Sequence, residues 1–341
     1  MLRPLLAAAR NAARCAIEQP GAAAAAEAPL WPVRHLWTDI RGYQHFEGRG
    51  PLISKGNVRR LLGGALLAGG AYYSSCVQEV PYTHRRRAIM FLSPSTELAM
   101  GQQLWEHTLR EAREAGTLLP PDHSYSRLVA SVGRRIAAVA CDGEGGGYQE
   151  HMKHMDWEYA VINSPMVNAF VVPGGKVVVF TGLLRTMRTE DELAAVLAHE
   201  SAHIMARHSA ENTGRANAGV LALIVFNGLM NFRMPPGLLN VALLLPHSRA
   251  AENEADAIGL QLLARACYSP DANVRMLQRL ADLERPSKGA LLPDSPLLRT
   301  HPLSTERVER VRAALPEAYK AFQSRCSAVQ DVWQDAARVL R

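Results

Sequence analysis

The segment His199-Glu200-Ser201-Ala202-His203 restricts what this chain can fold into more than any other feature of its sequence. On an α-helix, two histidines four residues apart lie one above the other, so both imidazoles can bind a single zinc ion. Glu200 follows the first histidine and is placed to take a proton from a water molecule instead of binding the metal. The pattern predicts a helix that carries a metal site. The alternative is a pair of surface histidines on an amphipathic helix.

A later acidic segment supplies a candidate third ligand. A catalytic zinc ion usually has three protein ligands and one position open to water. Glu252 and Asp256 are four residues apart and share one helical face. Glu252 would complete a set of two histidines and one glutamate, and Asp256 would accept the second ring N–H of a histidine ligand. We therefore expect one Zn²⁺ per chain, bound by His199, His203 and Glu252.

Several neighbouring groups are expected to take no part in binding the metal. Glu254 would point to another side of its helix and be solvated, and His247 fits a loop. His208, five residues beyond His203, would lie about 140° round the same helix, at a surface position. The five cysteines are scattered singly, and their odd number favours reduced, buried thiols over a disulfide framework. A structural zinc site, which normally needs a fourth cysteine or histidine, is therefore disfavoured.

Hydrophobic spacing predicts an α+β fold that is mostly helical, with a small β-sheet. Ser93-Pro94 is typical of a helix start, with serine as the N-cap and proline in the first turn. Residues 173–176 read Pro-Gly-Gly-Lys between two β-branched runs, which indicates a hairpin. Helices are expected over residues 93–115, 124–140, 189–212, 250–267, 272–284, 304–314 and 316–340, and strands over 159–163, 169–172 and 177–180.

The N-terminal residues carry arginines without acids. Arg3, Arg10 and Arg14 lie in a background of alanine and leucine, and the first acid is Glu18. This pattern predicts a mitochondrial transit peptide, and the alternative is a disordered basic tail. The net charge of the chain is +6 and its pI about 9.2. Because no nucleic-acid-binding module is recognisable, nucleic acid is not expected as a partner.

An uncharged apolar run, Leu61–Val77, follows Arg59-Arg60 and precedes another basic cluster. It is at the short limit for a bilayer, where about 20 residues are usual. We expect a membrane anchor, and the alternative is a buried glycine-rich helix. A second apolar stretch, residues 219–232 and 238–245, is broken by Pro235-Pro236. The break favours a helical hairpin that is buried or dips into the membrane.

The histidine segment at residues 199–203 and the acidic segment at residues 248–256 together resemble a known family. The pattern His199-Glu200-x-x-His203, followed by Ser248-Arg249-x-x-Glu252-x-x-Ala255-Asp256, resembles the gluzincin family that contains the HtpX heat-shock peptidase and the CAAX prenyl proteases. Within it, the chain is most similar to mitochondrial inner-membrane members whose activity overlaps that of the m-AAA protease. The narrower resemblance covers about Val80 to Ala314 and rests on the motifs at residues 80–87, 168–176, 180–184 and 300–302.

The resemblance implies roles for several residues. It assigns His199, His203 and Glu252 as zinc ligands and Glu200 as the catalytic base. It makes the strand of Asn168, Ala169, Phe170 and Val171 the edge that binds an extended substrate backbone. It places His301 and Arg307 opposite the reacting carbonyl, where they would stabilise the oxyanion. His301 could instead cap a helix or turn before Pro302, and Arg307 could instead form a salt bridge with an acid such as Asp256.

The 341 residues then divide into a transit peptide and poorly ordered leader (1–58), an anchor segment with basic flanks (59–87) and a zincin-type metallopeptidase domain (88–341). The resemblance implies a zinc endopeptidase of the mitochondrial inner membrane that cleaves membrane-associated proteins in protein quality control. Its partners would be protein substrates, membrane lipid and, as an open alternative, further copies of the same chain. A non-catalytic membrane scaffold or chaperone that keeps the fold is the rival interpretation.

Overall fold

The computed structural model describes residues 36–46, 55–89, 91–143, 150–230, 245–284, 297, 301 and 304–339. The chain forms two compact units, Met1–Leu66 and Leu67–Arg341. In the first unit, β1 (Leu36–Thr38) and β2 (Gln44–Phe46) form an antiparallel hairpin. No structure was expected there, but the Asp39 side chain accepts hydrogen bonds from the backbone N–H groups of Arg41 and Tyr43 and stabilises the turn. The transit-peptide residues and the Pro235-Pro236 break lie outside the described part of the chain.

The helix α1 (Lys55–Cys76) covers most of the segment expected to be an anchor. Its leucines at positions 61, 62, 66 and 67 are between 60% and 78% exposed. Among the residues that the structure describes, no helix has the length and apolar character needed to cross a bilayer. The helix is followed by an antiparallel pair of short strands, β3 (Val77–Glu79) and β4 (Arg86–Ala88).

A three-stranded sheet lies in the second unit. Its order is β5 (Glu158–Ile162), β7 (Lys176–Phe180), β6 (Ala169–Val172), with β5 parallel and β6 antiparallel to β7. The expected hairpin is confirmed: Gly174 and Gly175 form its turn with positive φ angles of 96° and 82°, which glycine adopts without strain. Because β6 pairs only with β7 in this sheet, it is an edge strand.

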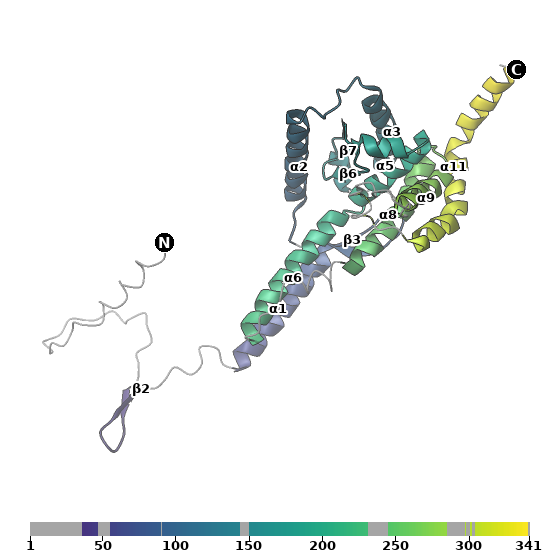
Figure 1. Cartoon of the computed structure of the whole chain (residues 1–341). Helices are drawn as coiled ribbons and strands as arrows, with labels where there is room; N and C mark the ends of the chain where they lie inside the picture. Colours follow the sequence, from purple (N-terminus) through teal and green to yellow (C-terminus); the bar gives the residue numbers. More distant parts are fainter. Residues whose placement is uncertain are drawn as a thin grey trace, which may run out of the picture. The chain divides into compact units, whose positions relative to one another are not determined.

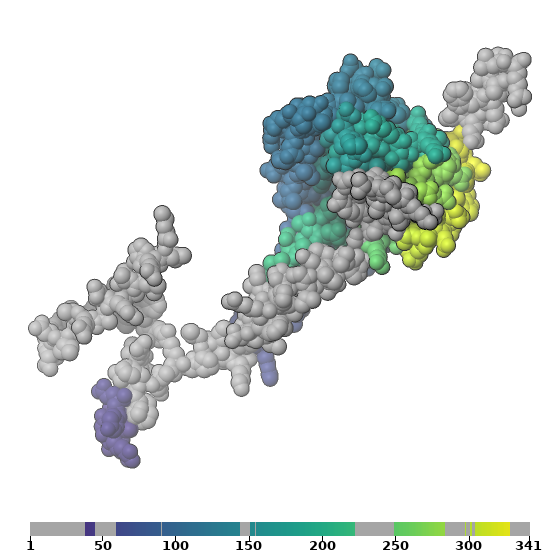
Figure 2. All heavy atoms as spheres, in the orientation of Figure 1, coloured from purple at the N-terminus to yellow at the C-terminus, as the bar shows by residue number. Residues whose placement is uncertain are grey.

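Helices cover both faces of the sheet (Figure 1). The side chains of β7 alternate: Val178 packs with Trp105 of α2 (Pro94–Glu114), whereas Val177 and Val179 belong to the main core. That core contains buried residues of α3 (Ser124–Cys141), α5 (Glu190–Met205), α8 (Leu245–Arg265) and α9 (Asp271–Glu284). Figure 2 shows these segments packed together, from the blue of α2 and α3 to the green and yellow of α8, α9 and α11 (Thr305–Val339). Two short helices, η2 (Glu150–His154) and α4 (Thr181–Thr186), precede β5 and α5 in the sequence. The predicted α+β, mostly helical class is confirmed.

The helix that carries the metal motif ends earlier than expected. A single helix over residues 189–212 was predicted, but α5 ends at Met205 and α6 (His208–Met230) begins after a break. Arg207 lies at the break with a φ of 49°, in the left-handed region. Its buried guanidinium donates to Glu97 of α2 at 2.9 Å, a tertiary contact that helical spacing does not reveal. The break redirects the chain immediately beyond His203.

The C-terminal helix also differs from expectation. Two helices were predicted on either side of residue 315, but α11 (Thr305–Val339) is continuous through Pro316. A proline inside a helix removes one hydrogen bond and disturbs the preceding turn. Val311 and Ala318, one on each side of Pro316, are both buried in the core, and this packing offsets the loss.

The cysteine expectation was wrong. Cys267, which follows α8, forms a disulfide with Cys326 of α11. The two lie 59 residues apart in the sequence, and their proximity follows from the packing of α11 against α8, which no sequence spacing indicates. Cys76 and Cys141 are free thiols.

Candidate metal centre

Three side chains converge between α5 and α8. His199 and His203 extend from α5, and their Nε2 atoms lie 3.2 Å apart. Glu252 of α8 places its Oε2 atom 3.4 Å from the Nε2 atom of His199 and its Oε1 atom 3.4 Å from the Nε2 atom of His203. Ligands bound tetrahedrally to zinc at about 2.0–2.1 Å are separated by roughly 3.3 Å. The three predicted ligands therefore have the spacing that a zinc ion requires.

The close approach of α8 to α5 makes this convergence possible. A Cβ atom on Gly259 would lie 3.0 Å from the Cα atom of His199, so only glycine allows the two backbones to come this near. Residues one and two turns earlier on α8, Asp256 and Glu252, then face the imidazoles. Both carboxylates are buried.

Glu200 is placed beside the three donors as a candidate base. The side chain is buried, and its Oε1 atom has no hydrogen-bond partner. Burial raises the pKa of this carboxyl above its ordinary value. An unpartnered buried carboxylate oxygen is costly. The free oxygen of Glu200 is placed to accept a hydrogen bond from a water molecule at the metal. The residues present therefore fit a catalytic metal site, which keeps a position open to water.

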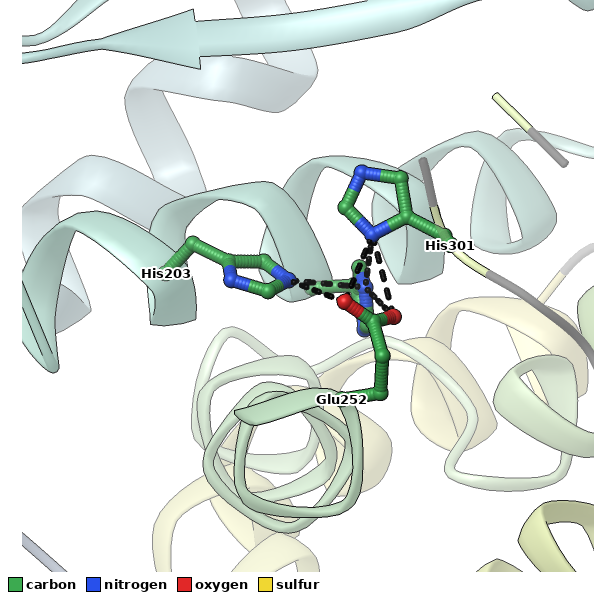
Figure 3. A group of neighbouring side chains, drawn as sticks. His203, Glu252 and His301 are labelled. Atoms are coloured by element: carbon green, nitrogen blue, oxygen red, sulfur yellow. Dashed lines mark hydrogen bonds and ion pairs between the residues drawn. The ribbon is translucent and has the colours of Figure 1, made fainter. Parts of the chain in front are cut away.

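His301 lies on the opposite side of the cluster, in the segment before α11. Figure 3 shows its imidazole directed at Glu252, with His203 approaching the same carboxylate from α5. The Nδ1 atom is 2.9 Å from Glu252, and Nε2 is 3.6 Å from Glu200. The donor atoms of His199, His203, Glu252 and His301 all lie within 4.8 Å of one another, so His301 belongs to the group of side chains that could hold a metal ion.

Asp256 and Arg307 contact the proposed ligands His199 and Glu252. Asp256 lies 3.0 Å from His199 Nδ1, as expected for a residue that orients this imidazole. Arg307 of α11 donates two hydrogen bonds to Asp256, at 2.7 and 2.8 Å, and its Nη1 atom is 3.2 Å from Glu252. The structure thus contains the salt bridge that was the alternative interpretation of Arg307.

The ionisation of the ligands follows from these contacts. Burial lowers the pKa of His199, but the neighbouring Asp256 and Glu252 carboxylates outweigh this effect and raise it to about 10. Burial would raise the pKa of Glu252, yet its contacts with His199 and His301 hold it well below the ordinary value. The pKa of His203 is lowered, mainly by burial. The negative charges of Glu252 and Asp256 are thus balanced by protonated His199 and by Arg307, and a divalent cation would take the place of the His199 proton.

Two residues expected at the surface are buried beside the site. Glu254 and His208 are 6% and 3% exposed. His208 Nδ1 lies 2.9 Å from His203 Nδ1, and His208 Nε2 lies 2.9 Å from Glu254. The prediction failed because it assumed one continuous helix; the break at Arg207 brings His208 back towards His203. The spacing of the acids correctly placed Glu254 on another side of the helix from Glu252. It could not show that this side faces His208 and not solvent.

The surroundings of Glu200 resemble a substrate cleft. The edge strand β6 packs against α5, and the backbone of Val171 hydrogen bonds to Glu200. Asn168, just before the strand, accepts a hydrogen bond from the backbone of Phe180 at 3.0 Å and so fixes the start of the edge. A small pocket of about 20 Å³ adjoins the site, lined by Val196, His199, Glu200, Met276, Leu277, Leu280, Leu297, His301 and Arg307. Most of its lining is apolar.

Comparisons with known proteins support the same interpretation. The family model described as peptidase family M48 matches residues 132–315. The chain is 40% identical over 258 residues to the mitochondrial metalloendopeptidase OMA1 of Schizosaccharomyces pombe, covering 75% of this chain and 72% of that protein. It is 33% identical over 276 residues to the protein of the same name from Saccharomyces cerevisiae, covering 79% of each. Identity to the mitochondrial metalloendopeptidase OMA1 of Homo sapiens is 32% over 186 residues, 50% of this chain and 34% of that one.

Proposed function

This chain belongs to peptidase family M48 and is a metalloendopeptidase, and we propose that its metal is a single zinc ion bound by His199, His203 and Glu252. The observation that supports this most directly is the spacing of the ligand atoms: the two histidine Nε2 atoms lie 3.2 Å apart, and each lies 3.4 Å from one oxygen of Glu252, beside the buried carboxylate of Glu200. Zinc in such a site polarises a carbonyl and makes water acidic enough to be deprotonated near neutral pH.

The catalytic role falls to Glu200. Its carboxylate accepts a proton from water as the water oxygen bonds to the carbonyl carbon of the scissile peptide. The protonated carboxyl then donates that proton to the leaving nitrogen as the C–N bond breaks. Because burial raises the pKa of Glu200, the group is able to hold the proton between the two steps.

His301 and Arg307 have different parts in this proposal. His301 lies 3.6 Å from Glu200, where an imidazole N–H could stabilise negative charge on the carbonyl oxygen. Arg307 lines the pocket, but its guanidinium is engaged with Asp256 and Glu252, so it positions these two carboxylates. This arrangement favours His301 over Arg307 as the residue that acts on the oxyanion.

The substrate is a protein segment in extended conformation. The unpaired edge of β6, starting at Asn168 and including Ala169, Phe170 and Val171, would add the substrate as a further strand. The small pocket next to Glu200 would present apolar residues of α9 to the substrate. Both features lie beside the base.

We place the enzyme at the mitochondrial inner membrane, acting on membrane-associated proteins in quality control. Support comes from the arginine-rich N-terminus, from the exposed leucines of α1, and from relatives described as mitochondrial. The leader (1–58) would direct import, and the segment at 59–87 would attach the peptidase domain (88–341) to lipid. Association of several copies of the chain is compatible with this placement.

Metal analysis tests the ligand assignment. Purified wild type is expected to contain one zinc per chain, whereas His199→Ala and Glu252→Gln are expected to contain little, because each loses one of three ligands. Inductively coupled plasma mass spectrometry after dialysis gives the ratio. Equal zinc content in all three proteins would rule out the proposed ligands.

A further inference from the structure

A chain of buried side chains extends from the metal ligand His203 away from the substrate cleft. His203 Nε2 faces the other ligands, and its Nδ1 atom lies 2.9 Å from His208 Nδ1. His208 Nε2 in turn lies 2.9 Å from the Glu254 carboxylate. His208 and Glu254 are both more than nine-tenths buried. None of the catalytic roles above uses either residue.

The contacts allow only one arrangement of ring protons when each histidine carries a single proton. A carboxylate only accepts hydrogen bonds, so the proton of His208 must be on Nε2. His208 Nδ1 is then an acceptor, and the proton of His203 must be on Nδ1. The lone pair of His203 Nε2 is thereby left free towards the metal site, as ligation requires.

Glu254 is itself held by the turn between β3 and β4. Thr83 Oγ1 donates to one of its oxygens at 2.6 Å, and Arg85 Nη2 donates to the other at 2.7 Å. The backbone of this turn places Tyr82 and His84 in the left-handed region, with φ values of 63° and 53°. Such conformations are costly for residues other than glycine and persist where surrounding contacts fix them.

Arg85 also binds a second buried carboxylate. Its Nη1 and Nη2 atoms donate to Glu211 of α6 at 2.9 and 2.8 Å. The same guanidinium therefore bridges Glu211 and Glu254. Of these two carboxylates, Glu254 is within hydrogen-bonding distance of His208 Nε2, whereas Glu211 accepts a further hydrogen bond from Arg215. This difference provides a matched control, because both carboxylates are buried and both are ion pairs of Arg85.

We propose that Glu254 and His208 are positioning residues that fix the tautomer and orientation of the zinc ligand His203, with the β3–β4 turn holding Glu254 in place. The inference rests on the proposed zinc site. It assigns a role to the motif at Val80–Arg87, which lies outside the metal-binding segments. It also makes metal affinity sensitive to the β3–β4 turn, which is separated from α1 by strand β3 alone.

Two substitutions of His208 separate hydrogen bonding from packing. His208→Asn keeps an oxygen that can accept from His203 Nδ1, whereas His208→Leu fills a similar space without an acceptor. We expect His208→Leu to lower zinc affinity by about 10- to 100-fold, the usual loss when a ligand's hydrogen-bond partner is removed, and His208→Asn to stay within about threefold of wild type. Competition with a chromophoric chelator measures the affinity of the full chain for zinc alone. Equal affinities of the two variants would overturn the proposal.

A second pair tests the carboxylate and does not depend on the first. Glu254→Gln is expected to weaken zinc binding by about tenfold, and Glu211→Gln to leave it unchanged although both lose an ion pair with Arg85. Equal losses of zinc affinity in the two variants would contradict the proposal. They would mean that the β3–β4 turn affects zinc binding only through the stability of the fold. Thermal melting of the metal-free proteins reports that stability separately.

Nitrogen-15 NMR of histidine-labelled, zinc-loaded wild type reads the tautomers directly. The His203 ring proton is expected on Nδ1 and the His208 ring proton on Nε2, and any other assignment contradicts the proposal. A wild-type protein that binds no zinc would instead overturn the proposed function. The two failures are therefore distinguishable.

Discussion

At the scale of single residues, the buried carboxylate of Glu192 shows how an ion pair with a distant element fixes the start of a helix. Glu192, in the first turn of α5, is fully buried and accepts a hydrogen bond from Arg279 of α9 at 2.6 Å. It also accepts from the backbone N–H of Arg188 at 2.8 Å. These contacts fix the start of the helix that presents the metal ligands.

The ion pair of Glu192 predicts a pH dependence of stability. Burial raises the pKa of its carboxyl, but Arg279 and the Arg188 N–H outweigh this and lower it below the ordinary value of 4.5. A lowered folded-state pKa gives stability that is present above the unfolded-state value and is lost as pH falls through the folded-state value. The difference in unfolding free energy between wild type and Glu192→Gln should therefore be constant above about pH 6 and shrink below about pH 4.5. Urea denaturation of the metal-free proteins between pH 3 and 7 measures it, and a difference that does not vary with pH would contradict the assignment.

Helical spacing predicted that the proposed ligands would face one another, but it did not predict the residues that contact them from the other side. His199, His203 and Glu252 meet because helical periodicity places them on facing sides of α5 and α8. The contact of His208 with His203 could not be predicted, since it depends on a helix break stabilised by Glu97, more than one hundred residues away in the sequence. Long-range contacts of this kind leave no local pattern.

At the scale of elements, the packing of α8 on α5 determines the geometry of the centre. Gly259→Ala is expected to push the helices apart by a few tenths of an ångström, because its Cβ would lie 3.0 Å from His199 Cα. The overpacking should lower the free energy of unfolding by about 1–3 kcal/mol and weaken zinc binding, because Glu252 moves with α8. Chemical denaturation and chelator competition measure the two effects.

Gly64→Ala is the control for this substitution. It lies in the helix α1, where an added Cβ meets nothing within 4 Å. It should leave zinc affinity unchanged and cost no stability, since alanine favours helix over glycine. If Gly259→Ala behaved like Gly64→Ala, the close packing of α8 on α5 would not be what positions Glu252.

The elements themselves were predicted well where local signals exist. Ser93 does cap α2, accepting a hydrogen bond from the backbone of Thr96, and the Pro-Gly-Gly turn does join β6 and β7. The joining of two expected helices into α11 was missed, because Pro316 is a strong local break signal that burial of the flanking residues outweighs. Proline rules describe isolated helices better than packed ones.

At the scale of the whole molecule, the Cys267–Cys326 disulfide closes a long segment of the peptidase domain. The bridge joins residues 59 apart and ties α11 to the end of α8. The chain-entropy relation for a loop of this length gives about 4 kcal/mol of stabilisation. We expect Cys267→Ser and Cys326→Ser each to lose about this amount. The free thiol Cys141 provides the control Cys141→Ser, which should change stability little.

Differential scanning calorimetry with and without a reductant checks this prediction. Wild type should melt at a lower temperature after reduction, and Cys267→Ser should not respond. A wild-type melting temperature that reduction leaves unchanged would show that the bridge contributes nothing to the fold.

Family membership was also inferred correctly from short motifs. The metal-binding segments, with the motifs at residues 80–87 and 168–176, indicated the family that the comparisons confirm. Membrane attachment and the domain boundaries near Arg59 and Ala88 stay predictions. They depend on segments whose apolar composition suits either lipid or protein surroundings.

The account rests on Glu200 as the base of a metal-dependent peptidase, and one variant tests it most directly. Glu200→Gln keeps the shape of the side chain but cannot accept the proton from water. Its purified protein should bind one zinc per chain and show peptide cleavage reduced by at least about 10²-fold, within the range of general-base contributions. Cleavage of a fluorogenic peptide, measured together with zinc content, provides the result. A zinc-loaded Glu200→Gln protein with wild-type cleavage would contradict the mechanism.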